Sequence, residues 1–128
     1  MSHLLDTQIV LFAAAGSPAL SARARSLLND PGTTPWFSAA SLWEIAIKAA
    51  LGRPDFQVDE AALLTGLLDA GYRPLPVKPE HCLVLGHLPG LHKDPFDRML
   101  LAQAMVENLT LVTMDAVLAR YPGLVLAV

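Results

Sequence analysis

Short apolar runs alternate along the whole chain with longer segments in which apolar residues recur at helical spacing. The strand-like runs occupy residues 3–7, 33–39, 73–77, 109–115 and 123–128. The helical patterns occupy residues 8–16, 17–30, 38–53, 59–72, 78–88 and 94–108, with a further turn or two at 116–121. This alternation predicts an α/β fold, a three-layer α/β/α sandwich around a mostly parallel sheet, with residues 1–128 in a single domain.

Local signals predict where several of these helices begin and end. Gly16 is expected to end the first helix, because glycine readily takes the left-handed conformation at a helix C-terminus. Ser17 followed by Pro18 is the expected start of the second helix, with serine as the N-cap and proline at the first helical position. Asp94 followed by proline gives the same signal for the helix at residues 94–108.

Acidic residues fall where a parallel sheet forms its sites. Asp6 and Asp115 lie at the carboxyl ends of predicted strands, and ligands bind beyond those ends in open α/β sheets. The helix that starts at Asp94 precedes the strand ending near Asp115, so a short connection brings its first turn, with Asp97, to the same edge. Helix capping explains both acids of "DPFD" equally well, since negative charge favours a helix N-terminus.

Glu44 has two readings of its own. It lies in "SLWEIAIK", a segment that is apolar on nearly every side. A pair with Lys48 one turn later is the simplest explanation, and such pairs contribute about 0.2–0.5 kcal/mol. Alternatively, Glu44 points across the crevice toward Asp6 and Asp97, and a cation neutralises the three carboxylates because unpaired buried charge is unfavourable.

Such a cluster of oxygen donors suits Mg²⁺, or Mn²⁺, better than zinc. Ions of this kind lower the pKa of an attacking water and clamp a scissile phosphate. Carboxylates this close repel one another without metal, so raised pKa values are expected in the metal-free protein.

Composition narrows the function classes. Hydrophobic residues make up 53 % of the chain and charged residues 16 %, which predicts a buried core and an apolar surface for a partner. The net charge of −3 gives no basic signature for nucleic acid, although a metal-dependent carboxylate site lowers the charge by itself. No apolar run reaches the ~18–20 residues of a membrane span. Cys82, the single cysteine, is expected to be buried; without a cysteine pair, a cytoplasmic location is the simplest reading.

The remaining candidates keep two readings each. Basic residues near the acidic motifs contact RNA phosphates or are surface charges and partners of the acids; these are Lys48, Arg53, Lys93 and Arg98. His81, His87 and His92 show no metal-ligand spacing and are expected in surface or capping roles, with His92 closest to the acidic motif. Trp36 and Trp43 are expected in the core or in an interface.

Four segments in this order resemble the PIN-domain proteins, in particular the VapC-type ribonuclease toxins of bacterial toxin–antitoxin modules. They are "LLDTQ", "SAASLWEIAIKAALGR", "HKDPFDRMLLAQAM" and "LTLVTMD", and they extend over nearly the whole chain. The chain departs from many relatives at Gln8, where histidine is common, and at Phe12, where tryptophan is common. Neither departure removes an acid.

The resemblance implies a magnesium-dependent endoribonuclease whose acidic site maps onto Asp6, Glu44 and Asp97, with Asp115 as a more variable fourth acid. Thr7 and Thr113 match hydroxyl residues that the family places beside the acids. The family also implies a cognate antitoxin, a homodimer, and a structured tRNA or ribosomal RNA substrate.

Two other functions remain open from the residues. A non-catalytic partner-binding module on the same fold explains the apolar composition equally well. A phosphate-receiving signalling domain also places acids and magnesium at strand ends, but it requires adjacent acids after the first strand and a late lysine. Here "LLDTQ" has one acid, and no lysine follows Lys93.

Overall fold

A computed structural model describes residues 1–90, 93–121 and 124–128 of the chain. Within these ranges the chain forms one parallel sheet with the strand order β3-β2-β1-β4-β5. Its strands are β1 (Ser2–Leu5), β2 (Thr34–Ser38), β3 (Arg73–Leu75), β4 (Thr110–Thr113) and β5 (Val125–Ala127). The predicted sheet is confirmed, and every pairing within it is parallel.

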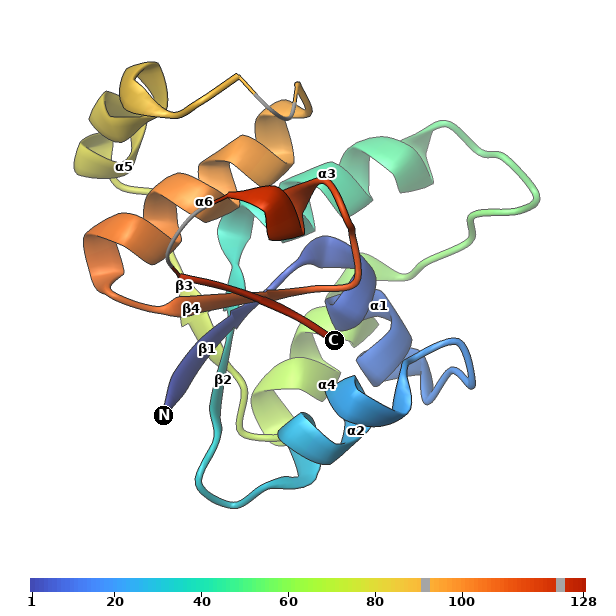
Figure 1. Cartoon of the computed structure of the whole chain (residues 1–128). Coiled ribbons are helices and arrows are strands. Elements are labelled where there is room, and N and C mark those ends of the chain that lie inside the picture. The colour runs from blue at the N-terminus through green and yellow to red at the C-terminus, as the bar shows by residue number, and fades with distance from the viewer. Residues whose placement is uncertain (91–92, 122–123) are drawn as a thin grey trace.

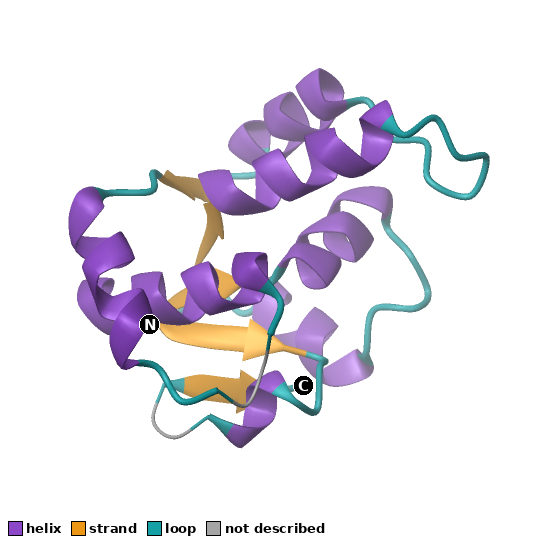
Figure 2. Ribbon diagram, turned by 90° about the horizontal axis from the view of Figure 1, so that it is seen from above, coloured by secondary structure: helices purple, strands orange, loops and turns teal. Residues whose placement is uncertain are grey.

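Helices connect the strands and cover both faces of the sheet. They are α1 (Thr7–Ala15), α2 (Ala22–Asn29), α3 (Ala39–Ala50), α4 (Glu60–Asp69), α5 (Pro79–Val84) and α6 (Pro95–Glu107), with 3₁₀ turns η1 (Leu85–His87) and η2 (Leu118–Arg120). In Figure 1, α5 and α6 lie on one side of the sheet and α1, α2 and α4 on the other. Figure 2 shows from above how the helices gather around a small central group of strands.

Alternation along the central strands divides the core between the two faces. Leu4 and Leu111 belong to the cluster formed with α6, whereas the next residues, Leu5 and Val112, belong to the cluster formed with α1, α2 and α4. All four side chains are buried. Because successive side chains of a strand point to opposite faces, a fully covered parallel strand needs apolar residues at both parities. The three-layer α/β/α sandwich is therefore confirmed.

The second helix starts later than Ser17 and Pro18 predict. It begins at Ala22, and the Ser21 hydroxyl caps it by accepting the N–H of Ala24 at 3.1 Å. The N–H of Ser17 closes the C-terminal turn of α1 by donating to the Phe12 carbonyl at 2.9 Å. The Ser17 hydroxyl does accept the N–H of Ala19 at 3.1 Å, and its carbonyl accepts that of Leu20 at 3.2 Å, but these bonds close only a turn before the helix.

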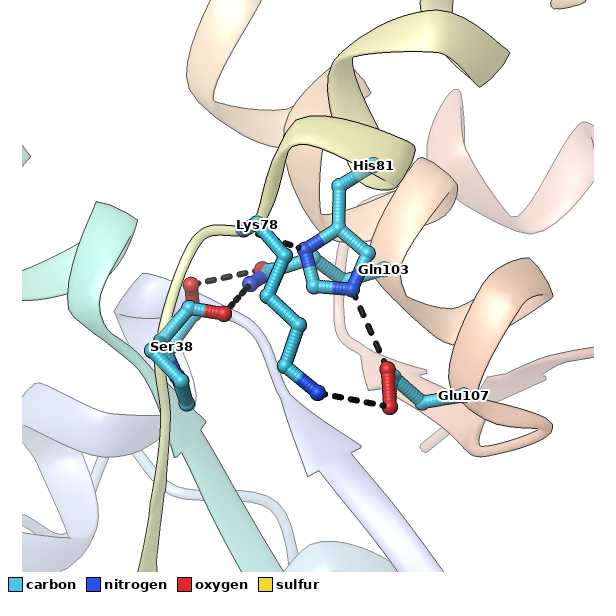
Figure 3. Close-up of polar contacts among 6 residues, drawn as sticks. Ser38, Lys78, His81, Gln103 and Glu107 are labelled. Atoms are coloured by element: carbon cyan, nitrogen blue, oxygen red, sulfur yellow. Dashed lines mark hydrogen bonds and ion pairs between the residues drawn. The ribbon is translucent and has the colours of Figure 1, made fainter.

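A buried polar network ties α6 to the sheet (Figure 3). Gln103 of α6 is fully buried; its Oε1 accepts the hydroxyl of Ser38 at 2.6 Å, and its Nε2 donates to the Pro76 carbonyl at 3.2 Å. Ser38 also caps α3 by accepting the N–H of Ala40 at 3.0 Å. One amide therefore joins α6, the end of β2 and the segment after β3, because a buried polar group is unfavourable without its partners.

His81 lies in the same region and is fully buried rather than on the surface, so the surface part of its predicted role is wrong. The capping part is confirmed, because Nδ1 accepts the backbone N–H of Lys78 at 2.9 Å. Its Nε2 lies 3.2 Å from Oε2 of Glu107 (Figure 3). This hydrogen bond, aided by the charge of Lys78, lowers the pKa of Glu107. Cys82, the next residue, is exposed and not buried as expected, because α5 turns its neighbour inward.

Trp43 does not enter the core. Its side chain is 64 % exposed and packs edge-on against Phe96, with ring centroids 5.2 Å apart. Trp36 is half-buried under the guanidinium of Arg73, which lies 5.6 Å from the ring centroid. Across the described ranges, no helix has the length and apolar character that a membrane crossing requires.

Candidate active site

The chain reverses its direction of progress through the sheet between β1 and β4. It builds outward from β1 through β2 to β3, and then returns to place β4 on the other side of β1. A crevice opens beyond the carboxyl ends of two strands at such a switch point. Asp6 follows β1 directly, and Asp115 lies two residues beyond the end of β4, so both predicted acids lie at this crevice.

Asp6 is buried and tightly held. Its Oδ1 caps α1 by accepting the N–H of Ile9 at 2.9 Å, and its Oδ2 accepts the hydroxyl of Thr113, the last residue of β4. Burial raises the pKa of Asp6, and the neighbouring charge of Asp115 adds to the rise. The hydrogen bonds from Thr113 and Ile9 oppose it without cancelling it. The expected raised pKa is therefore found at this carboxyl.

Asp94 and Asp97 have distinct positions at the start of α6. Oδ1 of Asp94 caps the helix by accepting the N–H of Phe96 at 2.9 Å and that of Asp97 at 3.4 Å, so its predicted capping role is confirmed. Asp97 lies in the first turn of the same helix. His92, which precedes them, lies outside the described residues.

The pair that one sequence reading of Glu44 predicts is present, whereas the shared cation of the other reading stays a prediction. Oε2 of Glu44 lies 3.0 Å from Nζ of Lys48, so the predicted i, i+4 pair forms. The residue is nevertheless buried, with only 7 % of its surface exposed, and it lines the same pocket as Asp6 and Asp97. Helix α3 brings this about because it packs against both α1 and α6.

The acids meet around a pocket of about 380 Å³. Among the described residues, its polar lining consists of five carboxylates, one ammonium group and two neutral side chains, which belong to Asp6, Glu44, Asp94, Asp97, Asp115, Lys48, Thr7 and Gln8. Thr7 donates its hydroxyl to Ser41 of α3 at 2.9 Å, which joins α1 to α3 beneath the pocket. Thr113 donates its hydroxyl to Asp6, and its Oγ1 also accepts the N–H of Asp115 at 2.9 Å. The structure thus brings all four acids predicted from the sequence to one pocket.

Arg98 is not among the side chains that line this pocket, and its accessory role stays a prediction. Its guanidinium donates to the carbonyls of Pro89 at 3.0 Å and Leu85 at 3.1 Å, and so anchors the segment around η1 against α6. Lys48, by contrast, does reach the pocket, which the i, i+4 spacing to Glu44 alone does not reveal.

The donor chemistry of the pocket fits a divalent cation. The anionic groups of the described lining are all carboxylates, whose oxygens are the ligands that Mg²⁺ and Mn²⁺ prefer. Oε1 of Glu44 is buried and accepts no hydrogen bond from any described residue. An unsatisfied buried carboxylate oxygen is unfavourable and favours a cationic partner. Among the described residues, however, no three His, Cys, Asp or Glu side chains lie close enough together to enclose an ion.

Comparison with known proteins assigns the family. Residues 3–124 match the sequence model of the PIN domain, and the chain therefore belongs to the PIN domain family. A search of curated proteins by sequence finds no match. The fold agrees with the family assignment, because several solved structures superpose on nearly the whole chain.

Three of these structures illustrate the likeness. VapBC2 from Rickettsia felis, bound to a DNA fragment of its promoter, has a TM-score of 0.70 at 21 % identity, covering 98 % of this chain and 96 % of that chain. DNA-bound VapBC from Salmonella typhimurium also has a TM-score of 0.70 at 21 % identity, covering 99 % and 98 %. VapC20 from Mycobacterium tuberculosis, a toxin that cleaves the sarcin–ricin loop, has a TM-score of 0.58 at 16 % identity, covering 93 % and 95 %. At these identities the likeness establishes a PIN-like fold.

Proposed function

We propose that this chain is a metal-dependent endoribonuclease and the toxin of a toxin–antitoxin pair. The observation that carries the proposal is the meeting of Asp6, Glu44, Asp97 and Asp115 around one pocket at the switch point of the sheet. These acids come from segments far apart in the chain, and helix capping alone gives no reason for all of them to face the same space. Membership of the PIN domain family supports the same chemistry.

In this proposal, Asp6, Glu44 and Asp97 hold Mg²⁺ or Mn²⁺, with Asp115 as a fourth ligand. When bound, the ion polarises a phosphoryl oxygen and lowers the pKa of the attacking water. The protein's own contribution is to fix the acids in advance. Asp6 is held by the Ile9 N–H and the Thr113 hydroxyl, so its carboxylate cannot turn away from the pocket. A preorganised group of this kind needs no rearrangement during the reaction.

Antitoxin binding is the second part of the proposal. Similar chains occur in VapBC complexes from Rickettsia felis and Salmonella typhimurium, and in FitAcB from Neisseria gonorrhoeae. An apolar groove of about 490 Å³ lies between α1 and α4, lined in part by Leu11, Leu63 and Leu67. A groove of this shape suits the apolar face of a partner's helix.

A homodimer is the third part. Trp43 and Ile47 lie one turn apart on α3, Leu51 is its C-cap one turn further, and all three are exposed. A row of exposed apolar side chains at this spacing is typical of a surface that packs against another helix. Sedimentation of the antitoxin-free chain as a monomer at micromolar concentration would contradict this part alone.

The experiment that tests the enzymatic function is cleavage of total cellular RNA by the purified, antitoxin-free chain with Mg²⁺, Mn²⁺ or EDTA. The variant Asp97→Asn removes one acid of the pocket. Asp69→Asn is its matched control, because Asp69 is exposed on α4 and does not line the pocket. We expect discrete fragments that require metal, an Asp69→Asn variant as active as the native chain, and an Asp97→Asn variant at least about 100-fold slower.

Equal cleavage by the native chain and Asp97→Asn would refute the assignment of the acids. Absence of cleavage by the folded native chain under every condition would favour a non-catalytic binding module instead. Discrete fragments of a structured tRNA or ribosomal RNA would identify the substrate, and a cytoplasmic site of action follows from that substrate.

A further inference from the structure

Lys48 is the cationic group in the lining of the acidic pocket. Its side chain is 46 % exposed, so the stem rises from α3 at the rim while the ammonium reaches back to Glu44. The distance between Nζ and Oε2 of Glu44 is 3.0 Å, a direct ion pair. Lys48 therefore already neutralises one of the acids proposed to hold a metal ion.

The two oxygens of Glu44 are treated differently. Oε2 receives the ammonium of Lys48, whereas Oε1 is buried and accepts no hydrogen bond from any residue in the described ranges. The side chain as a whole is 9 % exposed, so water reaches it poorly. A buried carboxylate with one unsatisfied oxygen is poised to gain a second cationic partner, or to exchange the one it has.

We propose that Lys48 is a resident counter-cation of the metal-free pocket, and that a divalent cation displaces its ammonium from Glu44 when it binds. The inference rests on the proposed function, since it takes the pocket to be a metal site. It adds a role for Lys48: this residue sets how strongly the pocket holds its metal.

Electrostatics favours exchange over simultaneous binding. An ion bound to the carboxylate of Glu44 at the usual ~2.1 Å would lie within about 5 Å of an ammonium that stayed at Oε2. The repulsion between a double and a single positive charge at that distance weakens binding by about tenfold even in bulk water, and salt reduces the effect to a few-fold. Lys48 is half-exposed, so its flexible stem can swing into solvent while the incoming cation takes over the charge of the Glu44 carboxylate.

The test is a titration of the full-length, EDTA-stripped chain with MnCl₂, followed by calorimetry, with no RNA present. Lys48→Met removes the charge and keeps most of the stem, and we expect it to bind Mn²⁺ about three- to tenfold more tightly than the native chain. Lys48→Arg keeps the charge and should bind as the native chain does. Lys78→Met is the matched control: Lys78 is similarly exposed at 42 % and also pairs with a glutamate, but it lies outside the pocket.

A second background separates exchange at Glu44 from general electrostatics. In Glu44→Gln, the added change Lys48→Met should lose most of its effect, because the ion pair that the metal replaces no longer exists. In the metal-free state, Lys48→Met should unfold at a lower temperature than the native chain, since Glu44 loses its partner, and saturating Mn²⁺ should abolish this difference.

Mn²⁺ affinity that is unchanged or weaker in Lys48→Met overturns the proposal, and so does an equal gain in Lys78→Met. A native chain that binds no Mn²⁺ overturns both this inference and the metal-dependent function. A chain that binds Mn²⁺ in the expected pattern but cleaves no RNA supports the role of Lys48 and refutes the nuclease, so the two failures are distinguishable.

Discussion

The N-cap of α6 offers a direct test of the capping role of Asp94 in the "DPFD" segment. Asp94 has extended backbone angles, with φ −65° and ψ 117°, and its Oδ1 accepts two backbone N–H groups at the helix start. These are the N–H of Phe96 at 2.9 Å and that of Asp97 at 3.4 Å. Replacing Asp94 by alanine leaves both donors without this acceptor, and we expect the free energy of unfolding to fall.

The geometry sets the size of the effect. The bond to Phe96 has an ordinary length, whereas the bond to Asp97 is longer than the ~3.2 Å typical of such bonds and counts for little. Loss of an N-cap acceptor to alanine costs about 0.5–2 kcal/mol. The lost attraction between Asp94 and the helix dipole adds about 0.3–1 kcal/mol, but relief of repulsion from the other acids of the pocket offsets it. We therefore expect Asp94→Ala to destabilise the protein by about 1 kcal/mol.

Urea unfolding near pH 7 in EDTA, followed by circular dichroism, measures this change without metal. With a slope of ~2 kcal/mol per molar urea, the midpoint should fall by about 0.5 M at an unchanged slope. Asp94→Asn is the control, because asparagine caps helices as well as aspartate does and should leave the midpoint nearly unchanged. If Asp94→Ala left the midpoint where it is, or if Asp94→Asn lowered it as much as alanine does, the capping assignment would be wrong.

Three further predictions concern stability in the absence of metal. Burial raises the pKa of Asp6, so the native chain should lose stability as pH rises from the ordinary aspartate value through the raised one; Asp6→Asn should lack this loss in urea midpoints measured between about pH 4 and 8. The bond from His81 lowers the pKa of Glu107, so its contribution is present at neutral pH and is lost as pH falls through the lowered value; Glu107→Gln should flatten the acid limb of the same curve. Gln103→Leu should cost about 1–3 kcal/mol in urea unfolding, because the buried hydroxyl of Ser38 loses its acceptor; a cost near zero would show that the network adds no stability.

The order of the elements and the location of the acids could be predicted from the sequence for physical reasons. Buried parallel strands require apolar residues at both parities, which makes "HLLD" and "LTLVT" easy to find. Asp6 and Asp115 could be assigned to one crevice because strand ends meet at one edge of a sheet. Glu44 stood out because a carboxylate in an apolar helix needs a partner, and the structure supplies Lys48 as that partner.

The predictions that failed have a common cause: neighbouring residues compete for the same role, and only the folded chain shows which of them takes it. Ser17 carries a good N-cap signal, but its hydroxyl and carbonyl close only a turn, and Ser21 caps the helix. His81 and Cys82 are adjacent on a short helix, and packing turns the histidine inward although a thiol is the more usual buried group. Arg98 follows the acidic motif directly, yet nearby carbonyls take up its donors. None of these choices is encoded at a single position.

The bond between Thr113 and Asp6 joins residues 107 positions apart. Asp6 directly follows β1, whereas β4, which supplies Thr113 from the other side of the switch point, comes after β2 and β3 in the chain. Synthesis proceeds from the N-terminus, so a chain still emerging from the ribosome holds the first acid long before the groups that fix and complement it. The catalytic pocket proposed here thus stays unassembled until β4 has been synthesised, and under the proposed function no cleavage would occur before that point.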